Sequence, residues 1–306
     1  MLKGWPPELK CNFCGNKIKT RDNILIFTEA PEVKLNGKKK YIGYDEVAGQ
    51  YGDNLYPEEI KNKLPESTGE VIADILGEDK IIADIGCGPG LLDIEIAERG
   101  HKVIAGDISL QMLKLFNHSE YVKNNSIISC RIDAHKLPFA DNSLDAVIGM
   151  QLLHFVGQPK TVVREIKRTL KVDGLFIVNG PCNRKVTNDE INLKMRYYYG
   201  QALKKRGIDE TKSPGWSSRE MRNKLDDMFS DKRIVDIDKL QIESRASWFY
   251  RRLKNKYSAF QIGISDNVHG EAMKEVENKI KREYGKDFRD IRQDNIWEEK
   301  LTIYYV

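Results

Sequence analysis

Cysteine is sparse in this sequence, and long apolar runs are missing. The five cysteines are odd in number and scattered, so they do not form a disulfide framework, and reduced thiols in the cytoplasm are the simplest expectation. No stretch reaches the roughly 18 to 20 consecutive apolar residues of a membrane-spanning helix, and residues 1–7 lack a secretory apolar region. The sequence therefore predicts a cytoplasmic protein with no membrane span.

A strong charge of one sign is also missing. The 50 Lys and Arg residues nearly balance the 46 Asp and Glu residues, so most basic side chains are expected on mixed-charge faces. Basic clusters occur at Lys38–Lys40, Lys204–Arg206 and Arg251–Lys256. Solvated loops and helix faces account best for them, and a phosphate- or RNA-binding patch stays open as the alternative.

From Lys80 onward, short apolar runs alternate with amphipathic stretches. The runs predict strands at 81–85, 101–107, 127–133, 144–150 and 175–179, and the stretches predict helices at 91–99, 110–116 and 161–170. Alternation at this pace is typical of a parallel sheet with helices on both faces, and fully buried parallel strands have nearly continuous apolar runs. The sequence therefore predicts an α/β, doubly wound fold with a mostly parallel sheet.

Pattern changes divide the chain into four segments. These are a turn-rich, ribbon-like segment at 1–40, a helical lid and linker at 41–79, the core at 80–180, and additions at 181–306 that complete the sheet. Within them we expect a helix starting at Pro57, a helix at 66–76 that Gly77 ends, a helix at 271–284 and a terminal strand at 301–306.

The most informative segment is Asp84-Ile85-Gly86-Cys87-Gly88-Pro89-Gly90, where a strand ends and a helix begins. Glycine lets the backbone turn sharply and approach a ligand, and the following helix presents free N–H groups to it. The next strand ends in Asp107, roughly 20 residues further on. In nucleotide-binding folds an acid at this spacing accepts hydrogen bonds from ribose hydroxyls. The spacing therefore predicts a nucleoside-containing cofactor.

The loop departs from the dinucleotide pattern in two ways. Leu91 stands where the third glycine of that pattern belongs. Asp84 at the loop entrance would be an unfavourable neighbour for a pyrophosphate, whereas a carboxylate suits a positively charged ligand such as S-adenosylmethionine.

Five segments resemble, in order, the motifs of class I S-adenosylmethionine-dependent methyltransferases. The glycine segment is similar to their first motif and Ala105-Gly106-Asp107-Ile108-Ser109 to their second. The others are Asp133-Ala134 with Leu137–Asp145, Met150-Gln151-Leu152-Leu153-His154-Phe155, and Val172-Asp173-Gly174-Leu175. The match covers about half of the chain and is specific for the cofactor, not for the acceptor.

The resemblance implies a seven-stranded sheet and S-adenosylmethionine as cofactor. Asp107 would bind the ribose, Asp133-Ala134 would lie beside the adenine, and the segment Met150–Phe155 would close the fourth strand and face the donor methyl group. The full expected set of cofactor residues is Tyr44, Tyr51, Asp84, Gly86, Cys87, Gly88, Asp107, Ile108, Met112, Asp133, Ala134, Met150 and Gln151.

Two positions before the core are open to two interpretations. The segment Tyr44–Tyr51 is similar to a helix that covers the cofactor in small-molecule methyltransferases, and an aromatic ring gains from contact with a sulfonium. Equally, Tyr44 and Tyr51 are spaced to share one core face of a helix.

The pair Cys11 and Cys14 has the spacing of a zinc knuckle, but a structural zinc site needs four ligands. The segment resembles the zinc ribbon of some rRNA guanine methyltransferases without its second knuckle. We expect a degenerate ribbon and no metal, with shared zinc or a redox pair as minority alternatives.

The expected reaction is methyl transfer to a small-molecule acceptor, for which the protein mainly positions the acceptor and excludes water. His154 is the best candidate base, since it follows the fourth strand, although a structural or cofactor-side role accounts slightly better for a histidine at that place. Trp248 and Arg251 are candidate acceptor-binding residues. Two alternatives stay open, an RNA methyltransferase and a non-catalytic binder of S-adenosylmethionine.

Overall fold

The structure is a computed structural model. It describes residues 17–28, 32–35, 38–41, 63–117, 127–180, 183–186, 189–208, 215–256, 261 and 264–306. Among the helices of these ranges, none combines the length and the apolar character that crossing a membrane requires.

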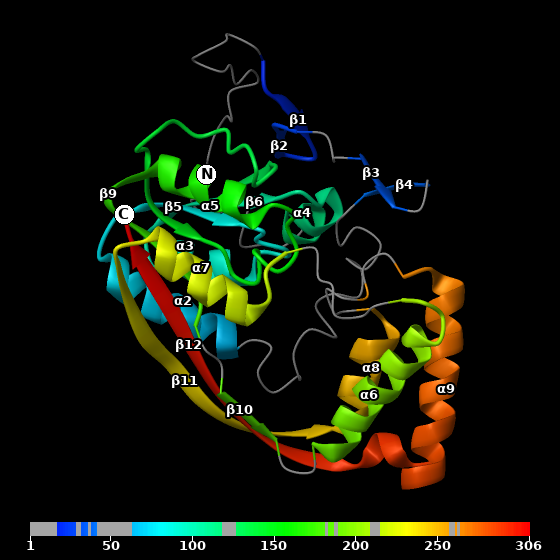
Figure 1. Ribbon diagram of the computed structural model, residues 1–306. Coiled ribbons are helices and arrows are strands. Elements are labelled where there is room, and N and C mark those ends of the chain that lie inside the picture. Colours follow the sequence, from blue (N-terminus) through cyan, green and yellow to red (C-terminus); the bar gives the residue numbers. More distant parts are fainter. Residues whose placement is uncertain are drawn as a thin grey trace.

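A mostly parallel sheet forms the centre of the molecule (Figure 1). Five parallel strands lie in the order β7 (Ile127–Arg131), β6 (Lys102–Asp107), β5 (Ile81–Ile85), β8 (Leu144–Ile148) and β9 (Leu170–Asn179). Strand β12 (Arg292–Tyr305) runs antiparallel to β9, and β11 (Asp231–Arg245) pairs with its other side. These seven strands correspond to the predicted seven-stranded sheet.

Three short strands enlarge the sheet, so within the described residues it has ten strands where seven were expected. Strands β1 (Lys19–Arg21) and β2 (Ile24–Ile26) form a hairpin, and β2 pairs in parallel with β7. Strand β10 (Asn183–Val186) pairs with β12. Strand β2 extends the core sheet because Ile24 and Leu25 are apolar and are buried at the β7 edge. Strands β3 (Glu32–Leu35) and β4 (Lys38–Tyr41) form a separate hairpin.

Helices cover both faces of the sheet (Figure 1). Helices α2 (Lys63–Leu76) and α3 (Leu91–Glu98) pack on one face, in a cluster with Ile82 and Val103. Helices α5 (Pro159–Thr169) and α7 (Ser218–Met228) pack on the other face, and α4 (Leu110–Asn117) packs beside β2. Successive strand residues point to opposite faces, so each strand contributes to both clusters.

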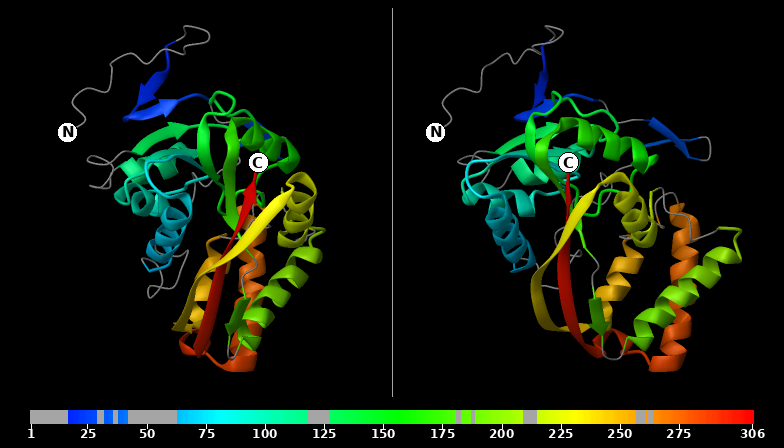
Figure 2. Two further views of the ribbon diagram at one scale, coloured as in Figure 1. Left: turned by 90° about the vertical axis from the view of Figure 1, so that its left-hand side faces the viewer. Right: turned by 60° about the vertical axis from the view of Figure 1, so that its left-hand side comes forward.

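The C-terminal additions build a second, helical part with its own apolar core. Helices α6 (Glu190–Lys204), α8 (Ala246–Lys254) and α9 (Asp266–Tyr284) and the short η4 (Phe288–Asp290) enclose side chains such as Tyr199 and Phe288. We call these four elements the helical module. The long β11–β12 hairpin connects it to the core (Figure 2).

The direction of this hairpin decides where the helical module lies. Residues Leu301–Tyr305 of β12 pair with Asn179–Leu175 of β9, while Asn295 pairs with Val186 in β10. The first part of β12, Arg292–Lys300, therefore continues past the carboxyl end of β9, for about 30 Å at the usual rise of a strand. The helical module packs at that far end, beyond the carboxyl edge of the parallel strands (Figure 1).

Several element boundaries follow from identifiable local chemistry. Gly77 ends α2 as expected, with a φ of 72° and its N–H donating to Ala73 O at 3.0 Å. Helix α9 begins five residues earlier than expected because the Ser265 hydroxyl accepts from the N–H of Val268. Strand β7 ends before Asp133, which turns back toward Lys136. The helix expected at Pro57 lies outside the described residues.

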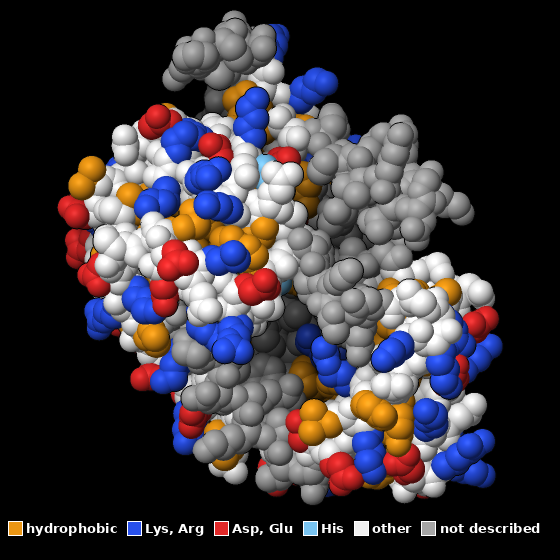
Figure 3. Space-filling view, in the orientation of Figure 1, with side chains coloured by type: hydrophobic (Ala, Val, Ile, Leu, Met, Phe, Trp, Pro, Cys, Tyr) orange, Lys and Arg blue, Asp and Glu red, His pale blue; other side chains and the backbone are white. Residues whose placement is uncertain are grey.

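Charges on the surface are mixed. Figure 3 shows Lys and Arg side chains interspersed with Asp and Glu over the described parts of one face. The expected basic cluster at 204–206 is partly neutralised, since Lys205 pairs with Glu275 and Arg206 pairs with Glu271 and Glu275 on α9.

Candidate cofactor and acceptor site

The glycine loop between β5 and α3 needs its glycines. Gly86, Gly88 and Gly90 have φ values of 83°, 57° and 72°, in the left-handed region that favours glycine. A Cβ at Gly90 would lie 2.1 Å from the buried ring of Phe116. The N–H groups of Gly86 and Cys87 donate to Gly106 O, at 2.7 and 3.1 Å. The loop is therefore folded back onto the end of β6.

Asp107 ends β6 and joins two loops at the carboxyl edge. Its Oδ2 accepts from the N–H of Gly88 at 3.0 Å, and its Oδ1 accepts from the N–H of Ser109 at 2.7 Å. The carboxylate is thus fixed beside the glycine loop.

Asp84 supplies a buried acid at the other side of the loop. Its side chain is 3% exposed, and within the described residues its Oδ1 has no hydrogen-bond partner. Burial, followed by the charge of Asp107, raises the pKa of Asp84 to about 8. A cation near this carboxyl would favour its ionised form.

Asp93, in the first turn of α3, is a second acid at this place. It is fully buried, and neither carboxyl oxygen has a hydrogen-bond partner in the part of the chain that the structure describes. Burial and the charge of Asp84 raise the pKa of Asp93 well above its ordinary range. Two buried acids next to a left-handed glycine loop, with three carboxyl oxygens that lack a partner within the described residues, fit a cationic nucleoside such as S-adenosylmethionine.

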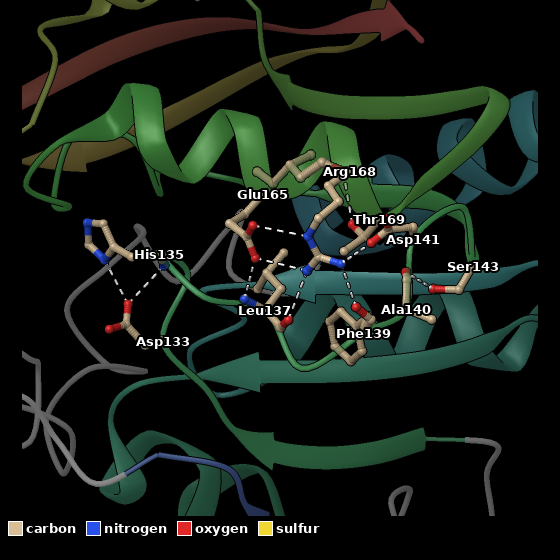
Figure 4. Close-up of polar contacts among 11 residues, drawn as sticks. Asp133, His135, Leu137, Phe139, Ala140, Asp141, Ser143, Glu165, Arg168 and Thr169 are labelled. Carbon is tan, nitrogen blue, oxygen red and sulfur yellow. Dashed lines mark hydrogen bonds and ion pairs between the residues drawn. The ribbon is translucent and has the colours of Figure 1, made fainter. Parts of the chain in front are cut away.

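A hub around Arg168 holds the loop that follows β7 (Figure 4). From α5, its guanidinium donates to Leu137 O at 3.0 Å and to Phe139 O at 2.8 Å. It also pairs with Glu165 and Asp141, and Glu165 accepts from the N–H of Leu137. One side chain thereby fixes the path of the chain just after Asp133.

Replacing Arg168 with methionine should free this loop. Two carbonyl groups lose a charged donor, so we expect the free energy of unfolding to fall by about 1 to 3 kcal/mol, which urea denaturation measures. Lys102→Met is the matched control. Lys102 pairs with the exposed Asp79, so this substitution should cost less than about 1 kcal/mol. Equal losses in the two variants would contradict the role of the hub.

The segment after β8 is held by two contacts. Gln151 has a φ of 55°, and its N–H donates to Asn179 Oδ1 at 2.7 Å. His154 lies partly buried, with Nδ1 2.6 Å from Trp216 O. A carbonyl only accepts, so Nδ1 carries a proton, and in the neutral ring Nε2 then has a lone pair.

The chain resembles known methyltransferases over its core. The family model described as a methyltransferase domain matches residues 83–178. A demethylmenaquinone methyltransferase of Renibacterium salmoninarum is 32% identical over 142 residues, which cover 44% of this chain and 58% of that protein. A tRNA 5-carboxymethoxyuridine methyltransferase of Escherichia coli is 25% identical over 145 residues, 44% of this chain and 54% of that protein.

Among solved structures, phosphoethanolamine N-methyltransferase 2 of Haemonchus contortus in complex with S-adenosyl-L-methionine is similar, with a TM-score of 0.45 and 15% identity. The alignment covers 89% of this chain and 57% of that one.

Residues 83–178 form a class I S-adenosylmethionine-dependent methyltransferase domain. S-adenosylmethionine is the cofactor of this methyltransferase domain. The chain spans 30%, 58% and 31% of the length of the first three curated relatives it matches.

The methyltransferase domain brings most of the predicted cofactor residues to one edge of its sheet. Asp84, the glycine loop, Asp107, Ile108, Asp133, Ala134, Met150 and Gln151 all lie at or just after the carboxyl ends of β5, β6, β7 and β8. Met112 is buried in α4, one turn after Ser109. Tyr44, Tyr51, Cys11 and Cys14 lie outside the described residues.

The two predicted acceptor residues differ in their surroundings. Trp248 is 5% exposed and packs with Leu64 and Leu240, between α8, α2 and β11. Arg251 is exposed on α8. Their role in acceptor binding stays a prediction.

Three features of the methyltransferase domain were missed from the sequence. An acid in a first helical turn such as Asp93 reads as a favourable helix start, and its burial has no sequence signal. From the sequence, Arg168 would be predicted to be a solvent-exposed basic residue in a charged helix. The contact between His154 and Trp216 joins residues far apart in the chain.

Proposed function

We propose that the protein transfers the methyl group of S-adenosylmethionine to a small-molecule acceptor, at an O, N or C atom. When bound, the cofactor supplies an activated methyl group, and the chain positions the acceptor and excludes water. Enzymes with this fold methylate many different acceptors, so the fold does not identify the acceptor. The proposal of a small-molecule acceptor therefore rests on the parts of the chain outside the methyltransferase domain.

The observation that carries this proposal is the course of the β11–β12 hairpin. It extends past the carboxyl edge of the sheet and carries the helical module to the edge where the cofactor residues lie. A small acceptor can be enclosed between these parts, whereas a folded RNA needs an open basic surface. The mixed charges of Figure 3 and the ion pairs of Lys205 and Arg206 support the small-molecule acceptor.

Within this proposal His154 removes a proton from the acceptor. Its Nδ1–H is fixed on Trp216 O, which leaves the lone pair of Nε2 as the proton acceptor. The contact is supported by tight backbone packing, since the N–H of Trp216 donates to Leu153 O at 2.9 Å and that of Gly215 donates to His154 O at 3.1 Å.

Replacing His154 with asparagine tests this role. The Asn amide can keep the bond to Trp216 O but offers no base, so we expect kcat to fall about 10²- to 10⁴-fold with unchanged affinity for S-adenosylhomocysteine. His154→Ala, which also loses the bond, serves as the comparison. An unchanged kcat in the Asn variant would exclude His154 as the base.

The function itself is tested in two steps. Calorimetric titration with S-adenosylmethionine and S-adenosylhomocysteine should give one saturable site per chain. Screening acceptors with a labelled methyl donor should then give a labelled small molecule. Salt-dependent retention on RNA, with label in the RNA, would favour the RNA methyltransferase instead. Binding without transfer to any acceptor would favour a non-catalytic binder.

Two further expectations belong to this proposal. The four segments at 1–40, 41–79, 80–180 and 181–306 would act as ribbon, lid, cofactor core and acceptor-binding additions. A cytoplasmic location follows from the sparse cysteines, of which Cys87 and Cys130 are free thiols in the described residues.

A further inference from the structure

His135 lies two residues after Asp133 at the carboxyl edge, and Figure 4 shows its two contacts with Asp133. Its backbone N–H and its ring Nδ1 both lie on Asp133 Oδ1, at 2.9 and 2.7 Å. Its other ring nitrogen, Nε2, lies on the carbonyl oxygen of Gly157. The ring therefore connects the loop after β7 with the segment between β8 and α5.

Both partners of this ring are acceptors. A carbonyl oxygen has no proton to give, and an aspartate carboxylate accepts only. A neutral imidazole has a single N–H and can satisfy one of the two, whereas an imidazolium donates to both. The two contacts of the ring therefore fit the doubly protonated form, in which both ring nitrogens donate.

We propose that His135, as an imidazolium, is a positioning residue of the cofactor site. Its two ring hydrogen bonds, to Asp133 Oδ1 and to Gly157 O, form a clasp that keeps the adenine side of the site closed. It rests on the expected place of Asp133 beside the adenine. Because all of these contacts to Asp133 use Oδ1, Oδ2 stays directed away from the ring and can accept from an exocyclic amino group. Gly157 lies three residues after His154. The hydrogen bond of His135 to Gly157 O therefore connects the adenine side of the site with the segment that carries His154 on the acceptor side.

The charged groups near the ring favour this state. Partial burial opposes the charge, but the hydrogen bonds to Gly157 O and Asp133 outweigh it, so the pKa of His135 is raised above its ordinary value. Among the described residues, Asp133 is the charged group in contact with the ring. In the neighbouring loop and α5, Glu165, Arg168 and Asp141 pair with one another, and Lys136 and Lys160 are exposed.

The sign of the pH dependence follows from this pKa. Because the pKa of His135 is raised above about 6.5, both ring hydrogen bonds form at low pH. One of them is lost as the pH rises through the pKa that His135 has in the folded protein. Thermodynamic linkage then requires the cofactor to raise the pKa of His135 further when it binds. Asp84, with a pKa of about 8, titrates in the same range and acts in the opposite direction, since its ionised form favours a cation.

The experiment therefore compares variants, so that the contribution of Asp84 cancels. S-adenosylhomocysteine is titrated calorimetrically into the wild type and into His135→Gln between pH 6 and 9. The Gln amide donates to one partner at every pH. The ratio of the wild-type affinity to that of His135→Gln should fall about 10-fold across this range. His101→Gln, at the amino end of β6, is the control and should keep the wild-type pH profile.

A direct readout separates positioning from a structural role. In protein labelled with ¹⁵N-histidine, the His135 signal, identified by its loss in His135→Gln, should report protonation of both ring nitrogens and a pKa that rises on addition of S-adenosylhomocysteine. A pKa unchanged by the ligand, or an affinity ratio independent of pH, would overturn the proposal. Absence of any binding in the wild type would instead reject the assignment of the cofactor.

Discussion

Replacing Gly90 with alanine is expected to destabilise the protein by about 2 to 5 kcal/mol. The left-handed φ of 72° costs an L-residue roughly 1 to 2 kcal/mol. The new Cβ would lie 2.1 Å from Phe116 Cδ2, a buried ring that cannot move freely, and such overpacking costs about 1 to 3 kcal/mol more. The measurement is the free energy of unfolding from urea denaturation.

Gly77 provides the matched control for this prediction. It has the same φ of 72°, and a Cβ there would have nothing within 4 Å. Gly77→Ala should therefore show the backbone cost alone. The cost of Gly90→Ala should also shrink in a Phe116→Leu background, because the smaller side chain relieves the contact. Equal losses at Gly77 and Gly90 would mean that the loop moves away from Phe116.

Replacing Asp107 with alanine is expected to weaken binding of S-adenosylhomocysteine about 100-fold or more. Hydrogen bonds to a charged group are each worth about 1.5 to 3 kcal/mol, and a ribose diol would make two of them. A loss of about 3 kcal/mol corresponds to about two powers of ten in affinity. The glycine loop would also lose its anchor, since Gly88 N–H donates to this carboxylate.

The readout for Asp107 is calorimetric affinity, with thermal unfolding to check that the variant folds. Asp227→Ala, an exposed acid on α7, is the control and should bind as the wild type does. A 2′-deoxy analogue of the ligand adds a sharper test, because Asp107→Ala should no longer distinguish it from the parent compound. An unchanged affinity in Asp107→Ala would refute the contact with the ribose.

The core of the fold and the cofactor loop could be predicted from the sequence because their signals are local. Buried strands such as Ile81–Ile85 have continuous apolar runs, and helices between them have a regular period, so the order of elements is visible along the chain. The left-handed turns require glycine at Gly86, Gly88 and Gly90. Asp107 could be placed because the length of one strand–helix unit fixes its spacing.

The tertiary structure alone decided what joins distant parts of the chain. Pairing of β2 with β7, the contact of His154 with Trp216 and the clasp of His135 on Gly157 depend on which edges and loops meet in space. Asp93 is buried because the first turn of α3, in which it lies, packs against the sheet. Hydropathy and spacing along the chain determine which residues form a strand or a helix. Contacts between residues far apart in the sequence depend on how these elements pack, and a local sequence pattern does not contain that information.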